Sequence, residues 1–565
     1  MIRRSYRFPH PWQGGRRMYD KLKTLIEHAR WDAAEEEVDL LAQSHCDEEL
    51  CVLQATVCEA RGDREGERKA IARGLTFNWR NYELFFMLGL WYQDLNINQA
   101  YLCMRQAEWY CAYGGESPHD WCIGTKAAAE TEAARREDLK DIRAIRIGME
   151  EQPGLSVNGL SVMILSYNNK ELMQECLQSV RRYHDCRRTE IVVVDNASTD
   201  GVAEWLRMQE DIRLIENGEN VGFPTGCNIG VMSCNAENDL LLLNNDAVLT
   251  PNALFWMQMA LYAEPAVGAV GAVSNHAAMQ DVQPEADPIP VQTGLSGELE
   301  WWMAYGIQNN LPMQQPYEER CRLTGFAVLM KKEVRGKVLI DGKLLFDPLF
   351  SPAYFEDDDL GMRIAKAGYR QLLCHNALIY HRGGKGFSSH GNHVMEDSRE
   401  KFLQKWHFDI WEYEAPWEEM IAAVRACVPD RNACARILQI DCGMGVTLSA
   451  LRYVYPNAYF AGTEKRADIA GIGQHMAHIH IGSAETMELP YPEHSFHIII
   501  VADALQYVKN PEIFLDKLSL ILAAEGTMLL SAGDYNRKEY VDYLSGKGFR
   551  TEELSQDILA VRHIS

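Results

Sequence analysis

The spacing of apolar residues changes near residue 160, and the chain before that point follows a helical pattern. Residues 17 to about 115 contain stretches of small and apolar residues at helical spacing, and three of these stretches have a turn residue, Asp32, Asp63 or Asn96, at their start. These turn residues are 31 and 33 positions apart, close to the roughly 34-residue period of helix-pair repeats. We therefore predict a helical repeat region over residues 17–150, which ends in a charged connecting helix.

From Leu160 onward, continuous apolar runs alternate with amphipathic stretches. The runs "LSVMILS", "EIVVVD" and "DLLLLN" each end in a polar turn, and the stretches between them, such as "KELMQECLQSVRRY", have helical spacing. This alternation predicts a mostly parallel sheet covered by helices on both faces. A second alternation of the same kind starts at about residue 433. The predicted fold class is therefore multidomain, with one helical region and two α/β domains.

The composition excludes some classes of function. The 565 residues include 56 basic and 80 acidic side chains, a formal net charge of −24, which argues against a nucleic-acid partner. No stretch approaches the roughly 20 apolar residues that cross a bilayer, and the basic N-terminal stretch lacks the apolar run of a signal peptide or membrane anchor. The 15 cysteines include no C-x-x-C pair, which is typical of reduced thiols. We expect a cytoplasmic protein without an integral membrane segment; peripheral association with the inner face of a membrane stays open.

Three predicted strands end in polar turns that are candidates for ligand binding, because ligands of parallel sheets bind beyond the carboxyl ends of the strands. The turns are Asp195-Asn196, residues 220–228, and Asn244-Asn245-Asp246. Each alone is also compatible with an ordinary turn and helix cap, and Thr250-Pro251 is predicted as the cap and first residue of the next helix. Asn244-Asn245-Asp246 precedes this cap and follows four leucines. A carboxylate at the tip of a buried strand usually meets a cation or a ligand donor.

Four adjacent acids, Glu356 to Asp359, stand at the start of another predicted helix. One or two acids there are explained by the helix dipole, which favours negative charge at the N-terminus by roughly 0.3–1 kcal/mol each. Four neighbouring carboxylates repel one another, so capping accounts for only part of the run. This stretch alone leaves two interpretations open, a solvated cap or a set of chemically active groups.

Taken together, ordered motifs in residues 158–410 resemble the family 2 glycosyltransferases, which have the GT-A nucleotide-diphospho-sugar fold. The motifs are "VMILSYNN", "VVVDNASTDG", "NVGFPTGCNIG", "LLLNNDAVLTPNAL", "LTGFAVLMKKEV", "YFEDDDLGMRIAKAGYR" and "YHRGGKGFS". Any one of them is weakly specific, whereas their combination in this order is highly specific. The resemblance implies a metal-dependent, inverting glycosyltransferase of the hexosyltransferase class that takes a nucleotide-sugar donor.

The resemblance implies a divalent metal, Mn²⁺ or Mg²⁺, at the end of the fourth strand. Asp246 matches the metal ligand of the family's D-x-D-like motif. His381 matches a histidine that is a metal ligand in many relatives, although a lone histidine is also compatible with a structural role. Asn244 replaces the first acid of the motif. This change lowers the charge of the site, so we expect weak metal affinity without donor phosphates.

The same resemblance implies a donor site. Asp195 matches the position that binds the nucleotide base, and Lys385 lies in a glycine-rich segment that is a candidate lid over the diphosphate. Cys227 stands where many relatives carry arginine, so the sugar and nucleotide of the donor stay open. The predicted donor-binding residues are Ser166, Tyr167, Asp195, Asn196, Asn228, Asn244, Asn245, Gly325 and Lys385.

The resemblance also gives the acid run a chemical role. The family places a Glu-Asp pair at this helix start, and the matching Glu356 and Asp357 are the predicted catalytic residues, with Asp357 as general base toward the acceptor. Asp359 matches the family's next acidic position, where a capping role is equally compatible. Asp358 is predicted to be solvated.

Residues 430–565 resemble the class I S-adenosylmethionine-dependent methyltransferases, in an order of segments that begins with "ARILQIDCGMGVTLSAL". The residues that match its cofactor site are Gly443, Gly445 and Glu464. Gln439, Asp441 and Ser483 depart from the family's pattern, and a carboxylate at position 441 would crowd and repel the carboxylate of the cofactor. We expect a degenerate domain that does not bind S-adenosylmethionine and that has a scaffolding or oligomerising role; active methylation is the alternative.

Three hypotheses about function follow. The leading one is transfer of a sugar to a cell-surface glycan or polysaccharide acceptor. The second is glycosylation of a protein or peptide, because residues 17–150 resemble tetratricopeptide repeats, whose concave surface can hold a polypeptide close to an active site. The third is a non-catalytic binding scaffold, supported by Asn244 and the altered methyltransferase loop. Assembly into a homo-oligomer stays open.

Overall fold

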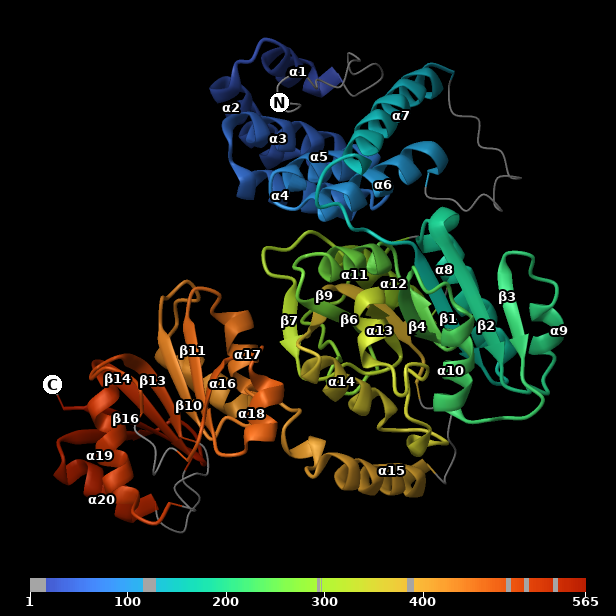
Figure 1. The fold of residues 1–565 in the computed structure, drawn as a ribbon. Coiled ribbons are helices and arrows are strands. Elements are labelled where there is room, and N and C mark those ends of the chain that lie inside the picture. The colour runs from blue at the N-terminus through green and yellow to red at the C-terminus, as the bar shows by residue number, and fades with distance from the viewer. Residues whose placement is uncertain are drawn as a thin grey trace. The chain divides into compact units, whose positions relative to one another are not determined.

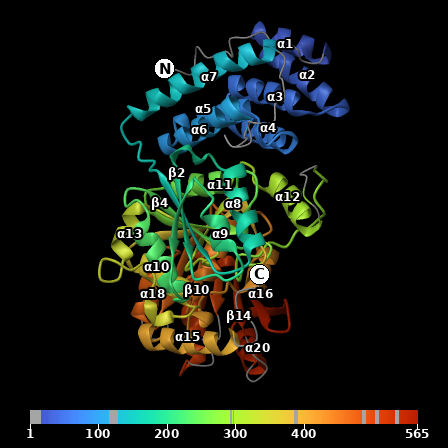
Figure 2. The ribbon, with the colours of Figure 1, turned by 90° about the vertical axis from the view of Figure 1, so that its right-hand side faces the viewer.

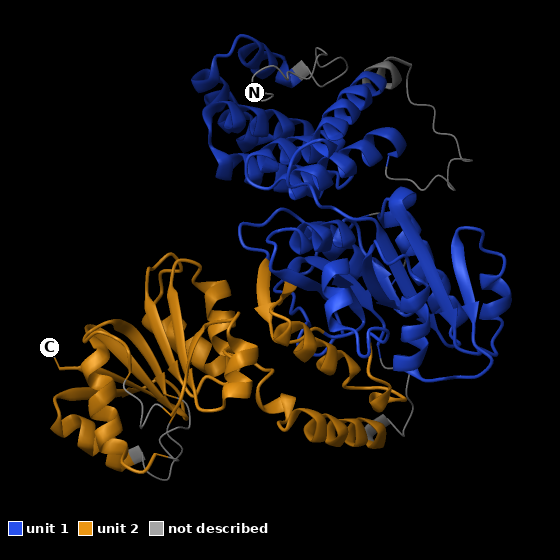
Figure 3. Ribbon diagram, viewed as in Figure 1, with its two compact units in different colours: residues 1–316, 324–345, 374–390 blue, residues 317–323, 346–373, 391–565 orange. Residues whose placement is uncertain are grey.

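The structure is a computed structural model, and it describes residues 17–114, 129–291, 295, 297–383, 391–483, 489–501, 508–531 and 537–564. The chain forms two compact units (Figure 3). Unit 1 comprises residues 1–316, 324–345 and 374–390, and unit 2 comprises residues 317–323, 346–373 and 391–565. Over the described ranges, no helix is both long and apolar enough to span a bilayer.

Unit 1 begins with a helical array, which Figure 1 and Figure 2 show as a layer made of helices only. Four of its helices begin after an Asp or Asn whose side chain accepts a hydrogen bond from the first turn: Asp47, Asp63, Asn81 and Asn96. The predicted start residues Asp63 and Asn96 are confirmed. Asp32 is not a cap, because its helix already begins at Trp31. The helices are α1 (Asp20–Glu27), α2 (Trp31–Ser44), α3 (Glu48–Arg61), α4 (Arg64–Phe77), α5 (Tyr82–Gln93), α6 (Ile97–Tyr113) and α7 (Ala129–Glu150).

The array packs on the sheet domain of unit 1 through α6 and α11 (Ala253–Leu261). The contact centres on Asn252, which is buried and left-handed, with φ 62°. Its Oδ1 accepts hydrogen bonds from the Tyr110 hydroxyl (2.5 Å) and Gln106 Nε2 (3.2 Å), and its Nδ2 donates to the Trp79 carbonyl (3.1 Å). Asn252 is the N-terminal cap of α11, so the prediction that Thr250-Pro251 starts this helix is wrong. Thr250 Oγ1 instead donates to the Leu378 carbonyl.

The sheet of unit 1 starts with four parallel strands, as predicted, in the order β3-β2-β1-β4. They are β1 (Leu160–Ser166), β2 (Thr189–Asp195), β3 (Ile212–Glu216) and β4 (Asp239–Asn244). The remaining strands make the sheet mixed rather than mostly parallel, because β4 pairs with β8 and β8 with β6 in antiparallel fashion. These strands are β5 (Ala247–Leu249), β6 (Val267–Val273), β8 (Ala327–Met330) and β9 (Arg370–His381). The short strand β7 (Tyr317–Arg320) belongs to unit 2 and pairs with β9, whose residues 370–373 also belong to unit 2.

Helices connect and cover these strands. The stretches predicted to be helical after β1, β2 and β3 are α8 (Lys170–Tyr183), α9 (Val202–Leu206) and α10 (Phe223–Ser233). Two further helices are α12 (Gly297–Asn309) and α13 (Lys332–Val338). The apolar runs of β2 and β4 are buried throughout their central residues, which holds the polar carboxyl ends of the strands at one edge of a rigid sheet.

Unit 2 contains the acid-run helix α14 (Glu356–Lys366) and a second α/β sheet in the order β12-β11-β10-β13-β14-β16-β15. The first five strands pair in parallel and the last two pairings are antiparallel. The two predicted α/β domains are therefore both present. The strands are β10 (Arg436–Ile440), β11 (Tyr459–Glu464), β12 (His478–Ile481), β13 (Phe496–Val501), β14 (Leu522–Ser531), β15 (Phe549–Glu553) and β16 (Ile558–His563). The other helices are α15 (Gly391–Trp406), α16 (Glu418–Cys427), α17 (Val446–Val454), α18 (Ala467–Gly473), α19 (Pro511–Ile521) and α20 (Arg537–Gly546).

Candidate active site

Three strands of unit 1 end in buried polar atoms that the fold itself does not satisfy. Ser166 closes β1, Asp195 closes β2, and Asn245 directly follows β4. Within the described residues, Ser166 Oγ, Asp195 Oδ1 and Asn245 Nδ2 are buried and have no hydrogen-bond partner. Burying a polar group without a partner costs about 1–3 kcal/mol on protein scales. Three such atoms at one edge of the sheet indicate a binding site for a polar ligand.

The loop after β2 is shaped by Asn196. Its Nδ2 donates to Asn220 Oδ1 (2.8 Å), and its Oδ1 accepts from Asn217 Nδ2 (3.0 Å) and the Val221 amide (3.1 Å). The Asn196 side chain therefore connects the loop after β2 with the loop after β3, and these hydrogen bonds fix the shape of this edge of the sheet. Asp195 keeps one oxygen for this loop, since its Oδ2 accepts from the Ser198 amide (3.1 Å).

Asp246 and His381 face each other at the start of β5 and the end of β9. Asp246 Oδ1 lies 3.2 Å from His381 Nε2, and both side chains are mostly buried. The antiparallel pairing of β5 with β9 places Ala247 opposite His381, which brings together two residues that are 135 positions apart in the chain. Burial opposes a positive charge on His381, but the Asp246 carboxylate outweighs it, so the pKa of His381 is raised above its usual value.

His381 is held by two residues that the sequence analysis did not single out, Asn275 and His276, in the turn after β6. Asn275 Oδ1 accepts from the His381 amide (2.7 Å), and Asn275 Nδ2 donates to the His381 carbonyl (3.0 Å). The carbonyl of His276 lies 2.6 Å from His381 Nδ1. A carbonyl oxygen only accepts, so Nδ1 carries the proton and Nε2 faces Asp246. No motif marked this turn, although its Asn-His pair after a buried strand resembles the other strand-end turns.

The other predicted donor residues differ in how the structure places them. Asn228 is buried in α10, next to the buried Cys227. Gly325 lies in a turn before β8, and the preceding Thr324 is tied to the turn after β6 through the Gln280 side chain. Tyr167 is 45% exposed. Lys385 lies outside the described residues.

In unit 2, the four acids of the run from Glu356 to Asp359 differ in burial and in their contacts. Asp358 was predicted to be solvated, and that prediction is wrong: its side chain is buried, with Oδ1 2.9 Å from Arg322 Nε. Burial raises the pKa of Asp358 to about 8, although Arg322 acts against this shift. Glu356 is also buried, and burial together with the neighbouring Asp357 raises its pKa well above the usual value. These carboxyl groups therefore retain protons at a pH where exposed acids are ionised.

Asp359 and Asp357 have contrasting environments although they are two residues apart. Asp359 is fully buried and accepts from Trp406 Nε1 (2.9 Å), with Lys405 Nζ at 2.5 Å and Arg363 Nε at 2.9 Å. This set of contacts is structural. The Asp357 side chain is 18% exposed, with Arg322 Nη1 4.0 Å from its Oδ2. Asp357 is thus the member of the run with the most exposed side chain.

The glycines of the methyltransferase-like loop have left-handed backbone conformations, and the Gly443 amide already donates to Glu464. Gly443 and Gly445 have φ values of 58° and 79°, and Asp441 is also left-handed, with φ 51°. The Tyr413 ring packs against Gly443, so closely that a Cβ atom on this residue would lie only 2.8 Å from the ring. Glu464 accepts from the amides of Gly443 (3.1 Å) and Arg466 (2.8 Å).

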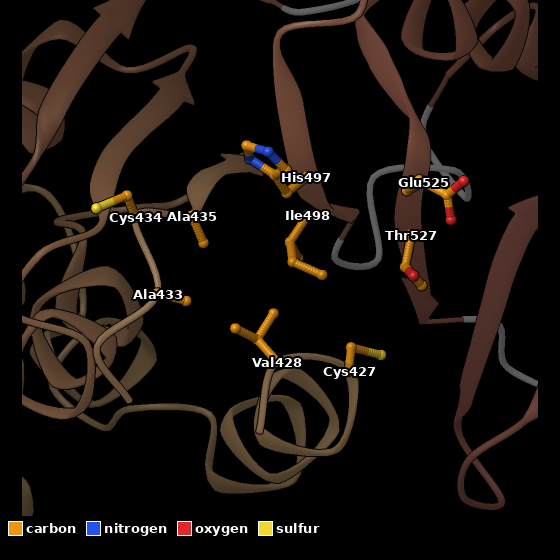
Figure 4. Close-up of a pocket in the computed structure, with 9 residues that line it drawn as sticks. All are labelled: Cys427, Val428, Ala433, Cys434, Ala435, His497, Ile498, Glu525 and Thr527. Carbon is orange, nitrogen blue, oxygen red and sulfur yellow. The ribbon is translucent and has the colours of Figure 1, made fainter. Parts of the chain in front are cut away.

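A cavity of about 300 Å³ lies elsewhere in this domain (Figure 4). Its walls include Ala435, His497 and Thr527, which stand at or near the starts of β10 and β13 and within β14. Ligands of parallel sheets bind at the opposite, carboxyl ends of the strands. This cavity is therefore not the cofactor site expected from the resemblance.

Comparisons with known proteins match two separate parts of the chain. Residues 161–334 match the family described as "Glycosyl transferase family 2", and residues 438–530 match a family described as "Methyltransferase domain". The N-acetylglucosaminyl-diphospho-decaprenol L-rhamnosyltransferase of Mycobacterium tuberculosis is 24% identical over 281 residues, which cover 46% of this chain and 88% of that protein. The poly-beta-1,6-N-acetyl-D-glucosamine synthase of Staphylococcus epidermidis is 27% identical over 131 residues, 23% of this chain and 31% of that protein.

Among solved structures, the mannosyltransferase of Pyrobaculum calidifontis in complex with GDP-Man and Mn²⁺ has 16% identity and a TM-score of 0.31, covering 63% of this chain and 85% of that one. The family matches fall on the first four strands with their polar ends and on the second sheet. The chain is therefore a glycosyltransferase with a family 2 domain at residues 161–334, followed by a methyltransferase-type domain.

Proposed function

We propose that this glycosyltransferase takes a sugar from a nucleotide-sugar donor, with the help of a divalent cation, and transfers it with inversion to a glycan acceptor. The observation that supports the donor site best is the set of three buried, unpartnered atoms, Ser166 Oγ, Asp195 Oδ1 and Asn245 Nδ2, in the described part of the sheet edge. A nucleotide base and ribose offer both donors and acceptors, which matches this mixture of a hydroxyl, a carboxylate and an amide. Asp195 is the candidate for the base, as the resemblance implies.

Asp246 and His381 fit a divalent cation of the Mn²⁺ or Mg²⁺ type. The His276 carbonyl leaves His381 Nε2 facing Asp246 Oδ1, the arrangement that a bound cation needs from a histidine. No group of three His, Cys, Asp or Glu residues in the described ranges could hold a metal, so the diphosphate of the donor would complete the ligand set. Such a cation would offset the negative charge that develops on the leaving diphosphate.

Asp357 is the proposed general base. Its carboxylate would take the proton of the acceptor hydroxyl while that oxygen forms a bond to C1 of the donor sugar. The bond from C1 to the diphosphate breaks in the same step, and the electron pair leaves with the diphosphate. A single displacement of this kind inverts the configuration at C1. Glu356, buried beside Asp357, would position the base rather than accept the proton itself.

The acceptor is proposed to be a glycan or glycolipid. The names of the two relatives refer to an N-acetylglucosaminyl-diphospho-decaprenol and to a poly-N-acetylglucosamine, not to polypeptides. The alternative of a polypeptide held by the repeats has less support, because the α6 face that carries Gln99, Gln106 and Tyr110 packs on the sheet domain. The family match and the glycosyltransferase relatives also argue against the non-catalytic scaffold.

The methyltransferase-type domain is proposed not to bind S-adenosylmethionine. Both oxygens of Glu464, the candidate ribose ligand, already accept backbone amides. The ring of Tyr413 lies close to Gly443, and Asp441 stands in the same loop, where its negative charge would oppose the carboxylate of the cofactor.

The test of the transferase is a coupled assay for released nucleoside diphosphate, with the full chain, MnCl₂ and a panel of nucleotide sugars. We expect release with at least one donor, and we expect Asp246→Asn to reduce it to background. The matched control is Glu237→Gln, which changes an exposed acid on the same domain and should leave the rate unchanged. Absence of both release and calorimetric binding for every nucleotide sugar would refute the proposal. The configuration at C1 of the product, read by NMR, tests inversion separately.

A further inference from the structure

Unit 2 contains a charge cluster around one buried guanidinium. Arg322 precedes the turn that leads to β8, and its Nε lies 2.9 Å from Asp358 Oδ1 and donates to Glu414 Oε2 at 2.5 Å. Its Nη1 is 4.0 Å from Asp357 Oδ2. Each of these four side chains is no more than 18% exposed. One guanidinium therefore lies among three carboxyl groups, one of which belongs to the proposed base.

Glu414 belongs to a short segment, residues 413–417, that the methyltransferase-type domain holds in place. The Tyr413 ring lies against Gly443 of the former cofactor loop. The Trp417 amide donates to Thr447 Oγ1 (3.0 Å) at the start of α17. Both ends of the segment are thus fixed by the loop and helix that would bind a cofactor in an active methyltransferase.

The same domain supports the turn that starts α14. Tyr354 and Phe355 are both left-handed, with φ values of 72° and 67°. Two such residues in a row cost of order 1–3 kcal/mol each and persist only where the surrounding packing determines them. Phe355 is buried in an apolar cluster that includes Met444, Ile469 and Ile472 of the methyltransferase-type domain.

We propose that the methyltransferase-type domain acts as a structural part of the transferase, and that Glu414 and Arg322 are positioning residues for the base Asp357. The glycine loop at residues 441–445 and the start of α17 hold residues 413–417. This segment positions Glu414, and Glu414 orients the Arg322 guanidinium, which faces Asp357 and Asp358. The inference rests on the proposed transferase function for its activity readout. A structural role of this kind explains why the glycine loop keeps its left-handed backbone conformation although Tyr413 packs against Gly443.

The test compares Glu414→Gln with Glu412→Gln, an exposed acid two residues earlier in the chain, in the full-length protein. Burial raises the pKa of Asp358, and the charge of Glu414 adds to that rise. Without the Glu414 carboxylate, the Arg322 guanidinium loses the acceptor that holds its Nε and is no longer fixed beside Asp357. We expect Glu414→Gln to lower kcat at an unchanged donor KM, and Glu412→Gln to leave both unchanged.

Two further measurements keep the inference open to refutation. Labelling with a water-soluble carbodiimide and an amine at a single pH, read by peptide mass spectrometry, reports on the surroundings of the part-exposed Asp357 without any sugar transfer. The extent of labelling at Asp357 should change in Glu414→Gln and stay the same in Glu412→Gln. Arg322→Lys keeps the charge but loses the fork that spans two acids, so we expect a lower kcat with an unchanged donor KM. An unchanged kcat together with unchanged labelling of Asp357 in Glu414→Gln would overturn the inference. If the labelling changes but no donor is turned over, the positioning cluster stands and the proposed transferase function fails.

Discussion

Two acids of one helix, Asp357 and Asp359, should respond to the same substitution in opposite ways. Asp359→Asn removes the buried carboxylate that Lys405 and Arg363 share, while Lys405 still pairs with Asp347. Breaking a buried pair in this way costs about 3–5 kcal/mol, and the solvent access of Lys405 places the expected loss near the lower end. At roughly 2–4 °C per kcal/mol for a domain of 150–250 residues, Tm should fall by about 6–12 °C.

Asp357→Asn should leave stability nearly unchanged and abolish most of the chemistry. Its Oδ2 is 4.0 Å from Arg322 Nη1, beyond hydrogen-bond distance, and an Asn side chain keeps an oxygen that can accept from the Asp358 amide, so the free energy of unfolding should change much less than in Asp359→Asn. A general base contributes roughly 10²–10⁴-fold to the rate, and transfer should fall by that factor while the KM for the donor stays the same.

The assay pairs differential scanning fluorimetry with the release of nucleoside diphosphate at matched protein concentration. The two variants control for each other, since both replace one Asp by Asn within one turn of α14. Retention of more than a third of the wild-type rate by Asp357→Asn would remove this residue from the base role. A large loss of rate in Asp359→Asn at an unchanged Tm would show that the roles of the two acids are reversed.

Three other predictions follow from the contacts described above. Asn275→Ala removes both hydrogen bonds that clamp the backbone of His381, so the apparent affinity for Mn²⁺, measured by titration of activity, should fall about 10–100-fold; unchanged affinity would contradict the metal assignment. Burial raises the pKa of Asp358 to about 8, so the folded state holds a proton that the unfolded chain releases between about pH 4 and pH 8; the free energy of unfolding should decline with rising pH, by at most about 1.4 kcal/mol per pH unit for this proton, and Asp358→Asn should flatten that decline in thermal melts. S-adenosylmethionine at 1 mM should not raise Tm, whereas a ligand at 100 times its dissociation constant would stabilise by about 2.7 kcal/mol; a clear upward shift would mean that the methyltransferase-type domain retains its cofactor site.

The sequence alone determined the elements and the chemistry at their ends. Runs such as "VVVD" and "LLLLN" have to be buried, and a buried strand that stops in Asp or Asn places that residue at an edge of the sheet. For the same reason, Asp63 and Asn96 could be identified as helix starts, since a cap is satisfied by the amides of its own first turn. Local interactions of this kind are encoded within a few residues, and the pattern of the chain shows them directly.

Tertiary structure alone decided which polar groups meet across the chain and which of them are buried. Asn275 and His276 reach His381 across 106 and 105 positions, and Glu414 reaches Arg322 across 92. Asp358 was expected to be solvated, but its side chain is buried next to Arg322, a residue outside its own helix. Whether a carboxylate is hydrated or buried depends on what packs against it. The segments that pack there are far away in the sequence, so no local pattern of residues predicts the contact.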